Sequence, residues 1–267
     1  MRSWNGWFWV NEPRLTLSIV SHDQRDLVCA LLGDLDRNVR TPLRAILTEN
    51  VPESSLRALP SCGFPLDVLR NARLKGFGAN HNGAFARCNT ELFCVLNPDI
   101  RIESDPFGAL LDAMREPSLA AIAPNVVDPL GRTEDHARSF PTIWEITGKA
   151  LGLSRSRIPA AGPVIYHPDW IAGMFVLFRS TAFAKVGGFD EGYFLYYEDV
   201  DICARLRELG LRVAVYPSVR VVHAARRSSH RDLRYTLRHA RSAARFFLHR
   251  PAQALGLKRL GSQADPT

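Results

Sequence analysis

The sequence lacks the features of disulfide-stabilised, zinc-binding and membrane-spanning proteins. Its five cysteines are an odd number and include no Cys-x-x-Cys pair, which disfavours a disulfide framework or a zinc site and favours a reducing compartment. No stretch approaches the roughly 20 apolar residues that a helix needs to cross a bilayer. We therefore expect a cytoplasmic protein without a spanning segment.

Two kinds of short signature are also missing, the common nucleotide-binding fingerprints and a secretory signal. The sequence contains neither the GxxxxGK[ST] pattern nor the GxGxxG pattern. The opening MRSWNGWFWV has three tryptophans but is too short for the apolar region of a signal peptide with its cleavage site. Two interpretations of this opening stay open, a disordered start and an aromatic anchor at a membrane interface.

Excess positive charge is absent outside one segment. The formal net charge is +7, and the stretch from His223 to Arg250 holds eight arginines and one acid, Asp232, which gives 8 − 1 = +7. The rest of the chain is therefore neutral. A neutral body with one basic segment indicates a local anionic partner and argues against a general nucleic-acid-binding protein. The length of 267 residues and the 46% hydrophobic content are ordinary for one α/β domain.

The first hundred residues alternate short apolar runs with helical periodicity. Strands are predicted for Leu15–Val20, Leu43–Leu47 and Leu66–Leu69, and a helix capped by Ser21 or Asp23 follows the first strand. This rhythm predicts a parallel sheet with right-handed crossovers, in which ligands bind at the carboxyl ends of the strands. The polar residues after the strands are therefore candidates for contacting a bound ligand: Ser21, His22, Glu49, Asn50, Asn71, Asn97 and Asp99.

A glycine-rich segment and a strand end carry further candidates. Gly76–Gly83 holds three glycines among polar amides. It is either a plain turn or the start of a helix from Ala84, whose N–H groups would bind a base or phosphate. The fully apolar strand Phe93–Leu96 stops at Asn97-Pro98-Asp99, where the proline ends the strand and directs the aspartate outward.

The second half repeats the strand pattern less regularly. Asp105 and Pro106 open a predicted helix. Asp128–Pro163 is punctuated by proline, glycine and arginine and is predicted to be a mobile loop with a short helix near Ile143–Leu151. The apolar runs predicted to be strands are Leu119–Val127, Met174–Phe178, Leu211–Tyr216 and Val219–Val222.

The stretch Gly187–Asp201, GGFDEGYFLYYEDVD, places five aromatic residues beside five carboxylates. A buried carboxylate must be paired, bind a metal or shift its pKa. Apolar periodicity after Glu198 and the stop at Gly210 predict a helix whose first turn holds Glu198 and Asp199. These acids are either an N-terminal cap or catalytic carboxylates, and the surrounding aromatics favour catalysis.

Three blocks together resemble the family 2 glycosyltransferases, especially the rhamnosyltransferase-like branch. They are GGFDE-x-x-F-x-x-YED-x-D-x-x-x-R from Gly187 to Arg205, GFGANHNGAF from Gly76 to Phe85, and VLNPDI from Val95 to Ile100. The resemblance implies a GT-A fold, a single α/β domain with a mostly parallel central sheet flanked by helices. Residues 15–223 would form this domain, with a nucleotide-sugar half at 15–100 and an acceptor half at 101–223. The remaining parts would be an extension at 1–14, a basic amphipathic helical segment at 224–250 and a tail at 251–267.

The resemblance also implies roles for individual residues. Asp199 would be the catalytic base, with Glu198 as the reserve candidate, and Asp99 with His223 would hold Mg²⁺ or Mn²⁺. Two positions depart from the common family pattern, because Glu49 and Asn97 stand where many members have aspartate. Trp170 and His223 also admit ordinary structural roles. The implied donor-binding set is Ser21, Glu49, Asn50, Asn71, Gly76, Phe77, Asn82, Asn97 and Asp99, and the implied acceptor-binding set is Trp170, Gly173, Asp190, Tyr196 and Tyr197.

By this resemblance the chain is an inverting transferase that moves L-rhamnose from dTDP-L-rhamnose to a hydroxyl of a bacterial cell-surface glycan precursor, possibly one linked to a lipid. A UDP-sugar is the alternative donor. Sugar-1-phosphate nucleotidyl transfer is disfavoured, because Ser21-His22-Asp23 lacks the glycine-rich loop that it requires. A non-catalytic protein that binds anionic polymers through its arginines is the rival from another class.

The arginine-rich segment is predicted to be an amphipathic helix. Arg231, Arg234, Arg238, Arg241 and Arg245 recur every three or four residues along one stripe. This face is either solvated or docked on anionic headgroups or a lipid diphosphate, which would hold the enzyme at the inner face of the cytoplasmic membrane. No nucleic-acid partner is expected, and the oligomeric state stays open. The neighbouring apolar stripe consists of Leu233, Leu237, Ala240, Ala244 and Phe247.

Overall fold

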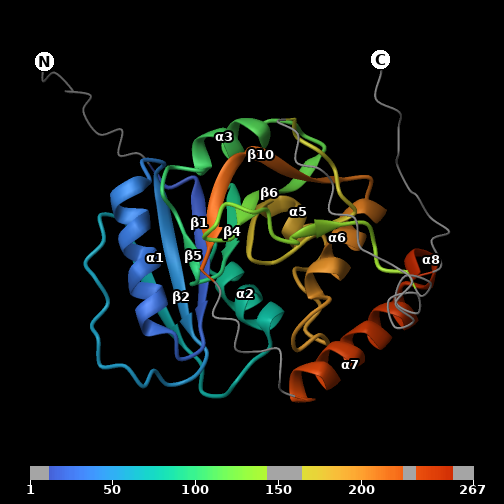
Figure 1. The fold of residues 1–267 in the computed structure, drawn as a ribbon, viewed down its shortest axis with the longest axis horizontal. Helices are drawn as coiled ribbons and strands as arrows, with labels where there is room; N and C mark the ends of the chain where they lie inside the picture. Colours follow the sequence, from blue (N-terminus) through green and yellow to red (C-terminus); the bar gives the residue numbers. More distant parts are fainter. Residues whose placement is uncertain (1–11, 143–163, 225–232, 255–267) are drawn as a thin grey trace, which may run out of the picture.

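One eight-stranded sheet organises the computed structural model, which describes residues 12–142, 164–224 and 233–254. The strand order is β3-β2-β1-β4-β9-β6-β10-β5. Most neighbours are parallel, while β9 and β5 run antiparallel to the strands beside them. Helices cover both faces of the sheet (Figure 1). This arrangement confirms the predicted α/β class and the mostly parallel sheet.

The first half of the sheet follows the predicted strands closely. β1 lies between β2 and β4 in parallel register, and its apolar residues are buried because helices cover both faces. One core forms under α1, and a second forms under α2 on the opposite face. The elements are β1 (Leu15–Ser21), α1 (Arg25–Asn38), β2 (Leu43–Glu49), β3 (Leu66–Arg70), α2 (Phe77–Phe85) and β4 (Leu92–Leu96).

Two helix starts differ from the prediction. The N-cap of α1 is Gln24, whose N–H donates to Ser21 Oγ at 3.1 Å, so neither Ser21 nor Asp23 is the capping residue. The glycine-rich segment does not precede a helix at Ala84, because α2 itself begins at Phe77. Its small residues permit close packing, since a Cβ on Gly78 would lie 2.6 Å from Phe189 Cβ.

The second half closes the sheet with one long strand where two were predicted. β10 runs through both predicted segments, with a register shift between Tyr216 and Arg220. The intervening Pro217 has no N–H for the ladder, which explains the irregularity. The short pair β7–β8 and helix α5 were not predicted. The elements are β5 (Ile100–Arg101), α3 (Phe107–Ala113), β6 (Leu119–Val127), β7 (Ala137–Arg138), β8 (Trp170–Ile171), β9 (Phe175–Arg179), α5 (Ser180–Lys185), α6 (Glu198–Glu208) and β10 (Arg212–His223).

The predicted basic helix is present as α7 (Leu233–His249), followed by α8 (Pro251–Ala254). Its packed face differs from the predicted apolar stripe. Phe246 is fully buried, whereas Leu237 is 70% and Leu248 is 79% exposed. Ala240 and Ala244 are also exposed. The helix is rotated in this way because polar and aromatic side chains of its inner face pack against the segment before α6. Figure 1 shows α7 at the edge of the molecule, near α8.

Some predictions fall outside the described residues. These are the aromatic opening, the short helix near Ile143–Leu151, most of the 251–267 tail and the side chains of Leu233 and Arg234. Within the described ranges, no helix is both long enough and apolar enough to span a bilayer. All five cysteines are free thiols.

Candidate active site

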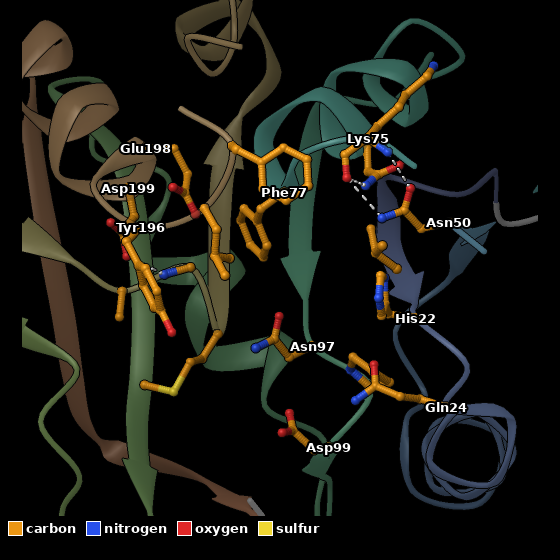
Figure 2. Close-up of a pocket in the computed structure, with 18 of the residues that line it drawn as sticks. His22, Gln24, Asn50, Lys75, Phe77, Asn97, Asp99, Tyr196, Glu198 and Asp199 are labelled. Atoms are coloured by element: carbon orange, nitrogen blue, oxygen red, sulfur yellow. Dashed lines mark hydrogen bonds between the residues drawn. The ribbon is translucent and has the colours of Figure 1, made fainter. Parts of the chain in front are cut away.

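A cavity of about 600 Å³ opens where β1 and β4 end and α6 begins. Such a position, at the carboxyl ends of parallel strands, is where α/β sheets bind ligands. Figure 2 shows Asn50, Lys75 and His22 on one side, Tyr196, Glu198 and Asp199 on the other, and Asn97 and Asp99 below them. The lining residues are Val20, His22, Gln24, Asn50, Leu74, Lys75, Phe77, Asn80, Asn97, Pro98, Asp99, Ala172, Gly173, Met174, Phe194, Leu195, Tyr196, Glu198, Asp199 and Arg238.

An amide network fixes the wall that holds Lys75. Asn50 Oδ1 accepts the Lys75 N–H at 2.9 Å, and Asn50 Nδ2 donates to the Lys75 carbonyl at 3.0 Å. Behind it, Asn71 Nδ2 donates to Asn50 Oδ1 at 3.0 Å and to Asn80 Oδ1 at 2.6 Å. Asn50 therefore lines the cavity as predicted, while Asn71 supports it from behind. Lys75, which the sequence did not single out, contributes its backbone to this wall, because Figure 2 shows its side chain extending away from the cavity.

Other residues of the predicted donor set lie outside the cavity. Glu49 is buried between Arg25 at 2.6 Å and Arg70 at 2.8 Å, so its charge is neutralised within the protein. The Ser21 hydroxyl accepts the Gln24 N–H in the turn before α1, and Ser21 does not line the cavity. Asn82 does not line the cavity. Its Nδ2 donates to the Phe189 carbonyl at 2.9 Å, and its Oδ1 accepts the Phe189 N–H at 2.9 Å.

The start of α2 joins the two halves of the site. The N–H of Phe77 donates to the Phe194 carbonyl at 2.9 Å. Gly76 permits this approach, because a Cβ there would lie 2.7 Å from the Phe194 oxygen. Phe77 thus lines the cavity beside the segment that leads into α6, while Gly76 supports it from behind.

Asp99 and His223 meet as the sequence predicted, and a third residue joins them. His223 Nε2 lies 3.2 Å from Asp99 Oδ2, and His223 Nδ1 lies 2.7 Å from Glu134 Oε2. Burial opposes the imidazolium charge, but hydrogen bonds to the two carboxylates raise the pKa of His223 to about 9. Glu134 was missed because it lies in the irregular 128–163 stretch, where no periodicity indicates which side chains turn towards the sheet.

The surroundings of Asp99 suit a divalent cation. Asp99 Oδ1 is buried and has no hydrogen-bond partner, and such an oxygen is a suitable ligand for Mg²⁺ or Mn²⁺. Among the described residues, however, no three His, Cys, Asp or Glu side chains converge as a complete metal cluster. Asp99 and His223 could therefore supply only part of a metal site, and diphosphate oxygens would have to supply the remaining ligands.

Two tyrosines in an unusual backbone conformation deliver the carboxylates of α6. Tyr196 and Tyr197 both have φ of 69°, a left-handed conformation that costs a non-glycine residue of order 1 kcal/mol or more. The helix begins at the next residue, Glu198, as predicted. Tyr196 lines the cavity, whereas Tyr197 is buried behind it against α7. Both tyrosines were predicted to contact the acceptor, and of these two only Tyr196 lines the cavity.

Asp199 is held by two backbone amides at the cavity wall. Gly173 N donates to Oδ2 at 3.2 Å, and Val200 N donates to Oδ1 at 2.8 Å. Burial raises the pKa of Asp199 even though these amides favour its charged form. Burial and the neighbouring Asp199 charge raise the pKa of Glu198 well above its ordinary value, and Glu198 Oε2 has no partner. Asp199 is therefore the carboxylate that backbone amides support in its charged form, whereas Glu198 has a buried oxygen without a partner.

Two more predicted acceptor contacts lie away from the cavity. Asp190 pairs with Arg245 at 2.8 Å. Trp170 Nε1 donates to the Ser139 carbonyl at 3.0 Å, and the ring packs against the second core. Phe194, Met174 and other lining residues were missed because their types are ordinary for a protein core and only the fold exposes them to the cavity.

Comparison with known proteins identifies relatives along most of the chain. A family model described as glycosyltransferase-like family 2 matches residues 55–242. Rhamnosyltransferase WbbL of Escherichia coli is 30% identical over 220 residues, which cover 78% of this chain and 82% of the relative. The N-acetylglucosaminyl-diphospho-decaprenol L-rhamnosyltransferase of Mycobacterium tuberculosis is 28% identical over 231 residues, covering 75% and 73% of the two chains.

Solved structures share the fold at low sequence identity. The mannosyltransferase PcManGT of Pyrobaculum calidifontis, in complex with GDP-Man and Mn²⁺, has a TM-score of 0.60 at 15% identity over 89% of this chain. GalNAc-T7, with UDP, GalNAc and Mn²⁺, has a TM-score of 0.64 at 15% identity over 95% of this chain. The chain spans 64% and 53% of these two proteins. The cavity, the family match and the shared architecture together show that this chain is a glycosyltransferase of family 2 with a GT-A fold.

Proposed function

We propose that this enzyme is an inverting rhamnosyltransferase that uses dTDP-L-rhamnose and a lipid-linked glycan acceptor of bacterial cell-surface polysaccharide synthesis. The observation that carries the proposal is the position of Asp199, across the cavity from the amide-held Lys75 wall (Figure 2). The two relatives named as rhamnosyltransferases support rhamnose as the transferred sugar, and the name of the Mycobacterium tuberculosis relative supports a lipid-linked acceptor.

Asp199 would act as the base. It accepts the proton of the acceptor hydroxyl while that oxygen attacks the anomeric carbon from the face opposite the nucleotide. The bond from the anomeric carbon to the diphosphate breaks, and the nucleoside diphosphate leaves with the electron pair. A carboxylate with a raised pKa is a better base at neutral pH than an ordinary one. Glu198, which keeps its proton, adds no second charge beside the attacking oxygen.

The opposite wall would hold the donor. Phe77 supplies an aromatic surface for the donor at the start of α2. Asp99 and His223 would hold a divalent cation, with Asn97 beside them, because the buried Asp99 oxygen has no protein partner. When bound, the cation stabilises the charge that develops on the leaving diphosphate. Glu134 would orient His223 through its Nδ1 hydrogen bond.

The outward face of α7 supports peripheral membrane binding at the inner face of the cytoplasmic membrane. Leu237 and Leu248 are largely exposed, and Ala240, Arg241 and Ala244 lie exposed between them. Apolar residues beside a cation suit an interface helix on anionic lipid. The predicted arginine stripe does not face outward along its whole length, because Arg245 forms an ion pair with Asp190 and Arg238 lines the cavity, whereas Arg241 is exposed.

A product assay tests the proposed reaction. The enzyme would be incubated with dTDP-L-rhamnose, UDP-N-acetylglucosamine, UDP-glucose and GDP-mannose, each with a sugar-diphosphate lipid acceptor and Mg²⁺ or Mn²⁺. Mass spectrometry should show addition of one deoxyhexose from dTDP-L-rhamnose, with inverted anomeric configuration by NMR. Transfer from a UDP-sugar alone would replace the proposed donor, and retention of configuration would overturn the mechanism.

A further inference from the structure

The inner face of α7 is fastened to the segment that precedes the catalytic carboxylates. Ser242 Oγ donates to the Leu195 carbonyl at 2.8 Å. The Arg245 guanidinium binds both oxygens of Asp190, with a shortest contact of 2.8 Å. Gly192 leaves room for this guanidinium, because a Cβ there would lie 2.2 Å from Arg245 Nη2 and would displace it from Asp190. These contacts place α7 at a fixed position against the acceptor side of the cavity.

Aromatic packing reinforces this attachment. The His239 ring lies 5.3 Å from the rings of both Tyr196 and Tyr197. The ring centre of the fully buried Phe246 lies 5.6 Å from the ring centre of Tyr197. The two tyrosines with left-handed backbone are therefore held from the side opposite the cavity. The backbone of α7 is thus held in place, and so is the attachment point of any α7 side chain that extends towards the cavity.

Arg238 is that side chain. It lies one helical turn before Ser242 and lines the cavity, with its guanidinium carbon 4.6 Å from the centre of the Phe194 ring. The other basic lining residues, His22 and Lys75, stand on the opposite wall (Figure 2). Among the described lining residues, Arg238 is therefore the basic group of the acceptor side.

We propose that Arg238 binds the phosphate of the acceptor substrate, so that this enzyme recognises a sugar carried on a diphosphate lipid by its charge as well as by its sugar. The inference rests on the proposed function and assigns a specificity-determining residue to it. A guanidinium presents a planar set of N–H donors that matches a phosphate in two parallel hydrogen bonds. The guanidinium carbon lies 4.6 Å from the centre of the Phe194 ring, and this cation–π contact restrains the Arg238 side chain at the cavity.

Charge balance in the cavity supports this assignment. Asp99 and Asp199 both line the cavity, and they would repel an acceptor that brings its own negative charge. A neutral glycan would need no cation on this wall. Arg238 offsets the repulsion for a phosphate-bearing acceptor, whose sugar hydroxyl must reach Asp199. Because Arg238 faces the cavity, it is distinct from the exposed Arg241 on the outer face.

Binding measurements test the subsite independently of the donor sugar. Isothermal titration would use decyl diphosphate as the probe, with enzyme saturated with a nucleoside diphosphate and Mg²⁺, and inorganic pyrophosphate as a second arm. Arg238→Gln should weaken binding of decyl diphosphate about 10- to 100-fold, and Arg238→Lys should weaken it less. Arg241→Gln, on the exposed face of the same helix, is the matched control and should bind like wild type.

Equal binding of decyl diphosphate by Arg238→Gln and wild type, or no binding by wild type, would overturn the assignment. Preference for pyrophosphate over the lipid would indicate a general phosphate site and overturn the acceptor role.

Kinetics separate this inference from the proposed function. One acceptor carries the sugar on a short-chain lipid diphosphate, and the other carries the same sugar as an uncharged alkyl glycoside. Arg238→Gln should lower kcat/KM about 10- to 100-fold on the first acceptor only, mainly through KM, and should leave the KM for the donor unchanged. Equal losses on both acceptors would assign Arg238 a structural role. If the wild-type enzyme transferred a different sugar but Arg238→Gln still lost activity on the charged acceptor only, the proposed donor would be wrong and the role of Arg238 would stand.

Discussion

The backbone N–H of Gly173 donates to Asp199 Oδ2 at 3.2 Å, so the turn before β9 holds a carboxylate at the start of α6. A side chain at this position is excluded, because a Cβ on Gly173 would lie 2.9 Å from the Phe77 ring. One glycine therefore contacts both the donor-side aromatic residue and the proposed base. This relationship explains how residues far apart in the sequence are kept at one geometry.

Asp199→Asn should abolish transfer and leave nucleotide binding nearly intact. The asparagine preserves the shape and the bond from Gly173 but cannot accept the acceptor's proton, and the loss of a positioned base costs about 10²–10⁴-fold in kcat. Steady-state kinetics and titration with the nucleoside diphosphate measure the two quantities. If Asp199→Asn kept near-normal turnover while Glu198→Gln lost it, the base would be Glu198.

Glu198→Gln should stabilise the protein, increasingly so as pH rises. Burial raises the pKa of Glu198, so the folded protein retains a proton that the unfolded chain releases, and this residue's contribution to stability falls as pH rises from its ordinary pKa through the raised one. Glutamine removes that penalty. Thermal unfolding from about pH 5 to about pH 8 should show a growing gain, about 2–4 °C in Tm per kcal/mol relieved. A gain that shrinks with pH, or an equal gain in the exposed control Glu103→Gln, would contradict the assignment.

Glu134→Gln should weaken binding of a divalent cation without removing a direct ligand. The carboxylate accepts a hydrogen bond from His223 Nδ1 at 2.7 Å, and the loss of such an orienting group typically costs about 10- to 100-fold in metal affinity. Titration with Mn²⁺ in the presence of a nucleoside diphosphate measures the effect. Glu103→Gln serves again as the control, and unchanged affinity in Glu134→Gln would remove this residue from the metal site.

Asp99→Ala should weaken donor binding and abolish its dependence on metal. Asp99 supplies the buried oxygen that no protein group satisfies, so its removal leaves His223 as the only predicted protein ligand. The affinity for the nucleoside diphosphate would be compared with and without Mg²⁺ or Mn²⁺. Metal-dependent affinity that survives the substitution would show that the cation is held elsewhere.

Replacing Leu237 and Leu248 with glutamate should abolish binding to anionic liposomes. Both side chains lie on the exposed face of α7, and an acid there removes apolar contact and adds repulsion. Wild type should co-sediment with anionic vesicles but not with neutral ones, and salt should weaken the binding. Activity on an uncharged soluble acceptor should be unchanged in the variant. Binding that ignores lipid charge would assign this face another role.

The sequence predicts those parts of the site that depend on strand ends and local motifs. Asn50, Asn97 and Asp99 follow apolar runs, and Asp199 opens a periodic helix, so their positions follow from the sheet. Glu49 follows a strand equally well, yet Arg25 and Arg70 neutralise it. The local sequence pattern cannot show which charged residues pair across different strands and helices. For this reason it did not distinguish the paired Glu49 from the residues that line the cavity.

Long-range packing decides the rest. Glu134 and Arg238 reach the site through an irregular stretch and through the docking of α7, neither of which has a periodic signature. The inner face of α7 was mispredicted for the same reason. Its packing partners are polar and aromatic residues of the 190–197 segment, so the burial of Ser242 and Phe246 does not follow the simple apolar stripe.

The attachment of α7 determines where this enzyme can be shortened. The predicted catalytic domain ends at His223, and the family match ends at residue 242, inside the helix. A chain cut at either point would lose Arg245 and Phe246 and with them the support behind Tyr197. We therefore expect the minimal functional unit to extend at least through α7, so that a fusion partner or affinity tag belongs beyond it.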